Sequence, residues 1–138
     1  MNSKAIQITE FDFDRLQKLV EEASHTYLRR RDYLVHLQAE LERAQVVRPE
    51  VVSNAVITMN STVVLLDMDT QQEETYTLVF PENADANRGY ISILAPIGMA
   101  MMGYQVGDTF EWPVPDGMRR LLVEEILYQP EAAGDYHL

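Results

Sequence analysis

The 138-residue sequence contains no cysteine, a single tryptophan and no long hydrophobic run. Without cysteine, neither a disulfide framework nor a cysteine-ligated metal site can form. No stretch approaches the roughly 18 apolar residues that a membrane-spanning helix needs, and residues 1–20 lack the apolar core and positive flank of a signal peptide. We therefore expect a cytoplasmic protein with one domain, or with a small domain and an appended helical element.

Positive charge is scarce in the second half of the chain. Residues 51–138 carry three arginines against thirteen Asp and Glu, whereas residues 1–50 carry eight Lys and Arg against nine Asp and Glu. Phosphates repel a segment this acidic, so we expect no strong direct DNA binding. An acidic surface suits a basic protein partner, and solubility alone is an equally good explanation of it.

Two apolar stripes at helical spacing occupy the first third of the chain. The first stripe consists of Phe13, Leu16, Leu19 and Val20, and the second of Leu34, Leu37, Leu41 and Ala44. The second has the 3, 4, 3 spacing of a heptad seam, and Asp12 is a candidate N-cap for the first. Because each helix would be marginal alone in water, we predict an N-terminal antiparallel helical hairpin, a short coiled coil, over residues 1–48.

Beyond Pro49 the apolar period changes to two, which is typical of strands. Strands are predicted at Val52–Met59, Thr62–Leu66, Thr75–Phe80, Tyr90–Leu94, Thr109–Val114 and Arg119–Tyr128. A short helix is expected after Pro96, since proline is favoured at the first helical position. The predicted fold class is α+β, with a mostly antiparallel sheet of five or six strands over residues 49–138.

One family resemblance covers nearly the whole chain. From Val56 to Tyr128 the pattern resembles the C-terminal domain of the Gre transcript-cleavage factors, an FKBP-like α+β domain. The residues that carry the resemblance are Met59–Val63, Tyr76–Val79, Ile91–Ile93, Pro96–Asp108 and Ile126–Tyr128. The segments Ala39–Gln45 and Tyr128–Tyr136, with the short hairpin, are similar to the Rnk-like members of this family, regulators of nucleoside diphosphate kinase.

The resemblance implies binding to the core enzyme of bacterial RNA polymerase at its secondary channel. The domain would dock at the channel rim through the residues Ala95, Pro96, Ile97, Gly98 and Met99. The hairpin would point inward, where Gre factors use acidic tip residues to hold a second Mg²⁺ in the polymerase active site. We expect this protein to bind as a monomer.

The hairpin tip departs from the Gre pattern. It contains Tyr27, Arg29, Arg30, Arg31 and Asp32, and so has three arginines and one carboxylate. Such a tip would repel Mg²⁺, and we expect no catalytic residue, metal or cofactor. The predicted function is a non-catalytic regulator that competes with Gre-type factors and modulates transcription elongation and gene expression, including nucleoside diphosphate kinase levels indirectly. The arginines would contact acidic polymerase residues, nascent RNA or a nucleotide, or form a solvated loop.

Two other functions stay open on the sequence. One is a transcript-cleavage factor like Gre itself. The other is an FKBP-like peptide-binding or prolyl isomerase module, with a pocket lined by Tyr76, Phe80, Tyr90 and Trp112, although we expect these aromatic side chains to fill the core.

Overall fold

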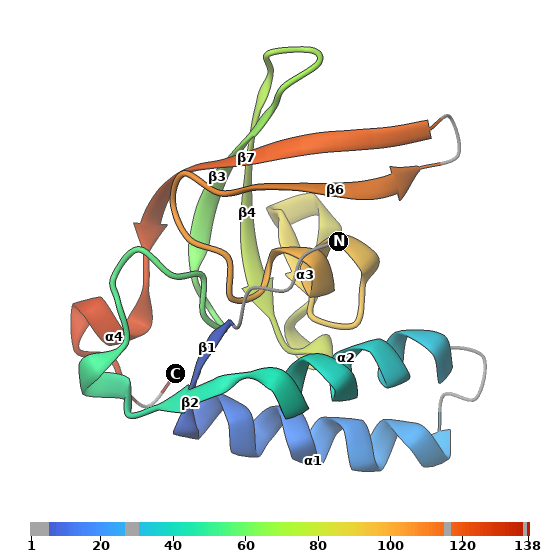
Figure 1. The fold of residues 1–138 in the computed structure, drawn as a ribbon, viewed down its shortest axis with the longest axis vertical. Coiled ribbons are helices and arrows are strands. Elements are labelled where there is room, and N and C mark those ends of the chain that lie inside the picture. The colour runs from blue at the N-terminus through green and yellow to red at the C-terminus, as the bar shows by residue number, and fades with distance from the viewer. Residues whose placement is uncertain (1–5, 27–30, 115–116, 137) are drawn as a thin grey trace. The chain divides into compact units, whose positions relative to one another are not determined.

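The computed structural model describes residues 6–26, 31–114, 117–136 and 138 (Figure 1). The chain divides into two compact units, Met1–Val52 and Ser53–Leu138. The first unit is mainly helical and the second is built on a sheet, so the predicted α+β class is confirmed. No helix among the described residues is long and apolar enough to cross a membrane.

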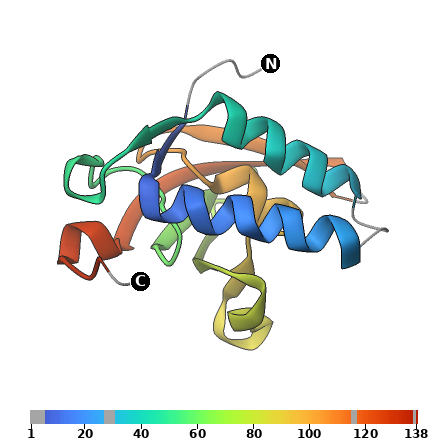
Figure 2. The same ribbon diagram turned by 90° about the horizontal axis from the view of Figure 1, so that it is seen from below.

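Two antiparallel helices make up most of the first unit (Figures 1 and 2). Helix α1 spans Glu10–Thr26 and helix α2 spans Arg31–Arg43. Five apolar side chains of the two predicted stripes are buried: Leu16, Val20, Leu34, Leu37 and Leu41. The predicted helical hairpin is therefore confirmed, while its description as a coiled coil stays a prediction.

A threonine caps the start of α1. The Oγ1 atom of Thr9 accepts a hydrogen bond from the backbone N–H of Asp12 at 3.1 Å, which is the geometry of an N-cap side chain. The Asp12 carboxylate instead accepts a hydrogen bond from Arg15 at 2.6 Å. The prediction that Asp12 is the N-cap is wrong, because Thr9 offers a capping oxygen three residues earlier and the helix begins at Glu10.

A small parallel sheet joins the two ends of the hairpin that lie away from its connection. Strand β1 spans Gln7–Thr9 and leads directly into α1, and strand β2 spans Gln45–Val47, shortly after α2. Ile8 lies opposite Val46 in this pairing. A 3₁₀ turn, η2, follows at Pro49–Val51. The sequence does not predict β2, since three residues, of which two are exposed, are too few to show a period.

The second unit contains a five-stranded sheet in the order β5-β4-β3-β7-β6. The strands are β3 (Thr62–Asp67), β4 (Glu73–Val79), β5 (Tyr90–Ser92), β6 (Thr109–Val114) and β7 (Gly117–Tyr128). All neighbours are antiparallel except β4 and β5, which are parallel. Five of the six predicted strands are thereby confirmed.

The sixth predicted strand, Val52–Met59, is absent. In this segment only Val56 makes a bridge, an isolated one with Gln105. Ile57 and Met59 are nevertheless fully buried. Val56 and Thr58 are buried as well, so the apolar pattern that predicted a strand reflects an irregular segment buried on all sides, which sequence periodicity alone does not distinguish from a strand.

One face of the sheet, called the inner face here, forms the core of this unit. Its fully buried side chains include Val63, Leu65, Leu78, Leu121 and Val123. Helix α3 (Pro96–Met101) lies beside β5 and β6 and adds the buried Met101. The β4–β5 connection contains the 3₁₀ turns η3 (Pro81–Asn83) and η4 (Ala86–Arg88), and the short helix α4 (Pro130–Ala133) follows β7.

An ion-pair cluster lies on the inner face near the β3–β4 turn. Arg119 on β7 contacts Asp67 at 3.0 Å and Glu74 at 2.8 Å. The Asp67 carboxylate also accepts hydrogen bonds from the backbone N–H groups of Thr70 and Asp69. These two backbone donors, followed by Arg119, lower the pKa of Asp67 against the opposing effect of its burial.

Replacing Asp67 with Asn is expected to reduce the dependence of stability on pH. Because the pKa of Asp67 is lower in the folded chain than its ordinary value of 3.8, the ionised carboxylate stabilises the fold above that pH and this contribution disappears as the pH falls through the folded-state pKa. Urea denaturation of both proteins at pH 7 and pH 3 measures the difference. If the free energies of unfolding of the wild type and Asp67→Asn differ by the same amount at both pH values, the lowered pKa of Asp67 is contradicted.

Candidate functional site

The corner formed by β5 and α3 contains the run that the sequence singles out. Pro96 occupies the first turn of α3, and the Ala95 N–H donates to the carbonyl oxygen of Ser92 at 2.9 Å. A Cβ atom built on Gly98 would lie 2.2 Å from that same oxygen. Since real Cβ atoms do not approach an oxygen so closely, glycine is needed here for the close approach of helix and strand.

Three of the five predicted polymerase-contact residues belong to the packing of this corner. Ile97, Gly98 and Met99 are buried, Ala95 is half-buried, and Pro96 is exposed. The contact itself stays a prediction. If it is made, Pro96 and Ala95 are the members of the run that have side-chain surface to offer.

The predicted hairpin tip is only partly within the described residues. Tyr27, Arg29 and Arg30 lie outside them. Arg31 and Asp32 are the first two residues of α2, so the one carboxylate of the predicted tip already belongs to the second helix. Among the residues that the structure describes, no three His, Asp or Glu side chains are grouped so that they could hold a metal ion.

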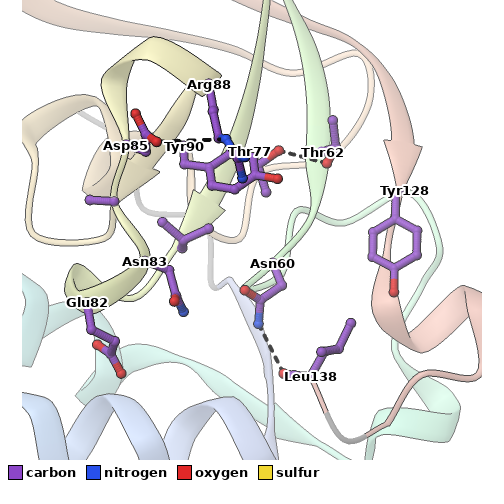
Figure 3. A pocket seen from close by; sticks show the side chains of 12 residues that line it. Asn60, Thr62, Thr77, Glu82, Asn83, Asp85, Arg88, Tyr90, Tyr128 and Leu138 are labelled. Atoms are coloured by element: carbon purple, nitrogen blue, oxygen red, sulfur yellow. Dashed lines mark hydrogen bonds and ion pairs between the residues drawn. The ribbon is translucent and has the colours of Figure 1, made fainter.

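A polar pocket opens at one end of the sheet in the second unit (Figure 3). Its volume is about 510 Å³. Its lining comes from β3, β4, β5, β7 and the turns after β4, and consists of Asn60, Thr62, Thr77, Val79, Glu82, Asn83, Ala84, Asp85, Arg88, Tyr90, Tyr128 and Leu138. The pocket is not evident from the sequence, because its residues are scattered over most of the unit and share no motif.

Hydrogen bonds among the lining residues fix several of its polar groups. The hydroxyl groups of Thr62 and Thr77 are 2.8 Å apart across β3 and β4. The Tyr128 hydroxyl donates to the carboxylate of Asp135 at 2.5 Å. This hydrogen bond, with burial and the negative charge of Asp135, raises the pKa of Tyr128 to about 12, so its phenol stays neutral at physiological pH.

The pocket does not match the aromatic pocket considered for a prolyl isomerase. Of the four aromatic residues considered, Tyr90 lines this pocket, Tyr76 does not, Phe80 is buried, and the side chain of Trp112 lies outside the part of the chain that the structure describes. Most of the lining side chains are hydroxyls, amides or charged groups. A site for a proline ring is lined mainly by apolar and aromatic side chains, and these are the minority among the described lining residues.

Comparison with known proteins gives the family. The regulator of nucleoside diphosphate kinase of Escherichia coli K12 is 38% identical to this chain over 139 residues, with 100% of both proteins covered. A family profile described as the Rnk N-terminus matches residues 4–47. The chain belongs to the Rnk family. The resemblance that the sequence analysis identified is thereby confirmed.

The second unit relates this Rnk-family protein to the Gre factors. A profile described as transcription elongation factor GreA/GreB, C-terminal, matches residues 52–128. Transcription elongation factor GreA of Sulfurovum sp. is 39% identical over 92 residues, which are 67% of this chain and 57% of that protein. A solved transcription elongation factor GreA/GreB from Nitrosomonas europaea is 39% identical and has a TM-score of 0.77, covering 91% of this chain and 100% of the other. The likeness to FKBP-like folds stays a prediction.

Adding one methyl group at Gly98 is expected to destabilise the second unit. In Gly98→Ala the new Cβ would meet the Ser92 carbonyl oxygen, so α3 or β5 must move, at a cost of about 1 to 3 kcal/mol in free energy of unfolding. Chemical denaturation followed by circular dichroism measures this. Pro96→Ala, at an exposed position in the same helix, is the control and should change stability by less than about 1 kcal/mol. Equal effects of the two substitutions would show that the close approach is not a constraint.

Proposed function

We propose that this protein is a non-catalytic regulator that binds bacterial RNA polymerase at the secondary channel. There it would compete with Gre-type factors and modulate transcription elongation and gene expression, with nucleoside diphosphate kinase levels changed indirectly. The observation that carries the proposal is the combination of full-length similarity to a Rnk regulator with a GreA/GreB-type second unit. The partner kind follows from the Gre relatives, which are named transcription elongation factors.

The composition of the tip supports a role without catalysis. Cleavage through a second Mg²⁺ needs hard oxygen ligands at the tip, and the connection between α1 and α2 supplies arginines instead. The helices are also short: 17 and 13 residues correspond to about 25 and 20 Å at 1.5 Å per residue. Both features disfavour the alternative of a Gre-type cleavage factor.

The division of labour that we propose follows the two parts of the chain. Residues 1–48 form the hairpin that enters the channel, and residues 49–138 form the domain that docks at its rim, with Ala95 and Pro96 among its contacts. We propose that the protein acts as a monomer in the cytoplasm, where its partner is found. Strong direct DNA binding is not part of the proposal, because the second unit carries three cations against thirteen acidic residues.

The first test is binding and competition on a backtracked elongation complex. We expect the protein to co-purify with core polymerase at micromolar concentration and to inhibit GreA-stimulated transcript cleavage in trans, since both factors would occupy one channel. Without GreA, addition of the protein and Mg²⁺ should leave the cleavage rate at its intrinsic value. Failure to bind core polymerase would refute the proposal, and stimulated cleavage would establish the catalytic alternative.

The second test concerns the three arginines at the tip. We propose that they contact acidic polymerase residues, so the triple variant Arg29→Glu, Arg30→Glu, Arg31→Glu should bind core polymerase about tenfold more weakly, because each charge now repels its partner. The triple variant Lys4→Glu, Lys18→Glu, Arg48→Glu has the same net charge and serves as control. Equal affinity of the two variants would indicate that the tip is a solvated loop.

A further inference from the structure

The strand register places three rows of side chains on the face of the sheet opposite the inner face, called the outer face here. The rows are Thr77–Thr62–Tyr128, Thr75–Val64–Glu125 and Glu73–Leu66–Leu122. Successive rows are two residues apart along β3 and β4, or about 7 Å, and three residues apart along β7, where the register shifts. The first row forms the floor of the polar pocket, so the pocket is one end of a surface about 14 Å long.

The arginines of the second unit are all engaged by carboxylates of the same unit. Arg88 faces Asp85, Arg119 joins Asp67 and Glu74, and Arg120 faces Asp69. The unit contains no lysine. Among the described residues of this unit, every arginine therefore already has a carboxylate partner other than the acidic residues of the three rows.

Three carboxylates on or beside the outer face have no cationic partner in the part of the chain that the structure describes. They are Glu73, Glu124 and Glu125, and all three are exposed. Glu124 occupies a register shift in β7, where Val64 faces Glu125 and Leu65 faces Val123. A hydrogen bond with Glu73, together with the charge of Glu73, raises the pKa of Glu124. The proximity of these carboxylates thus disfavours their ionised forms, and a cation placed here would favour ionisation of all three.

The pocket has the same sign of charge. Glu82 and Asp85 lie on its wall (Figure 3). The Tyr128 hydroxyl donates a hydrogen bond to Asp135, and the charge of Glu131 contributes to raising the pKa of Tyr128. Among the described lining residues Arg88 is the one Lys or Arg, and it lies 3.9 Å from Asp85. Because the Tyr128 proton points to Asp135, the hydroxyl oxygen is left as an acceptor. A ligand that donates hydrogen bonds and carries positive charge fits this pocket best.

A partner strand cannot easily pair with β5, the edge strand of the sheet next to the pocket. At β5, the N–H and carbonyl of Tyr90 both bond with Asp85, and the Ser92 carbonyl accepts from Ala95. An added strand would find these groups already satisfied. A partner that reaches the pocket from this side must therefore be bound by side chains rather than by β-augmentation.

We propose that the outer face binds an extended, lysine- or arginine-rich segment of the partner protein, with one basic side chain entering the pocket. A surface of about 14 Å accommodates four or five extended residues. This inference rests on the proposed function, to which it adds the chemistry of the polymerase segment that the second unit contacts. It names a surface different from the Ala95–Met99 run.

The variant Glu82→Lys, Glu125→Lys tests the proposal in the full-length chain, because it reverses one charge in the pocket and one on the second row. Both side chains are exposed, so the fold should persist, which circular dichroism and urea denaturation check. The control is Glu50→Lys, Glu111→Lys, with the same charge change at two exposed positions outside the hairpin, the pocket and the three rows. We expect the first variant to bind core polymerase at least about tenfold more weakly and with a smaller salt dependence, and the control to stay within about twofold of the wild type.

A second measurement separates this inference from the proposed function. Isotope-labelled protein is titrated with an eight-residue peptide that alternates lysine and serine, and with the same peptide carrying glutamate for lysine. Amide shifts at Thr75, Thr77 and Tyr90 with the lysine peptide alone, lost in Glu82→Lys, Glu125→Lys, support the surface even if the wild type does not bind polymerase. Absence of such shifts, shifts elsewhere, or equal polymerase affinity of variant and wild type would overturn it.

Discussion

The close approach of α3 to the end of β5 is the contact on which the arrangement of the second unit depends. The Ser92 carbonyl oxygen accepts the hydrogen bond of Ala95, and the backbone of Gly98 lies so near that a Cβ there would be 2.2 Å away. Because of this contact α3 can place Ile97, Met99 and Met101 in the core. The glycine in the family run is therefore explained by packing before any partner is considered.

Ion pairs are the second kind of interaction that stabilises this unit. Its three arginines are held by its own carboxylates, and one of them, Arg119, links β7 to β3 and β4 on the inner face. What remains at the surface is uncompensated negative charge. The same distribution that stabilises the sheet from within thus leaves an outer face suited to a basic protein and unsuited to nucleic acid.

The sequence predicted the elements whose side chains alternate over at least four residues or repeat at helical spacing. Thr109–Val114 is one example, since strand β6 has the predicted bounds. The prediction failed where a residue is buried without belonging to a strand, as Ile57 is. It also failed at β2, which pairs over three residues that show no clear apolar pattern. The pocket could not be predicted, because Asn60, Arg88 and Tyr128 are brought together only by the sheet order and the turns after β4.

The connection between the helices and the second unit differ in charge, and this difference restricts how one partner protein can bind to both. The connection between the two helices carries the local excess of arginine, and the second unit carries nearly all of the net negative charge. A partner that engages both must present acidic groups to the first and basic groups to the second. Such opposite requirements orient a bound protein, since reversing its direction would set like charges against each other at both contacts. Binding in one direction without a metal-holding tip is sufficient for a factor that acts by occupying a site.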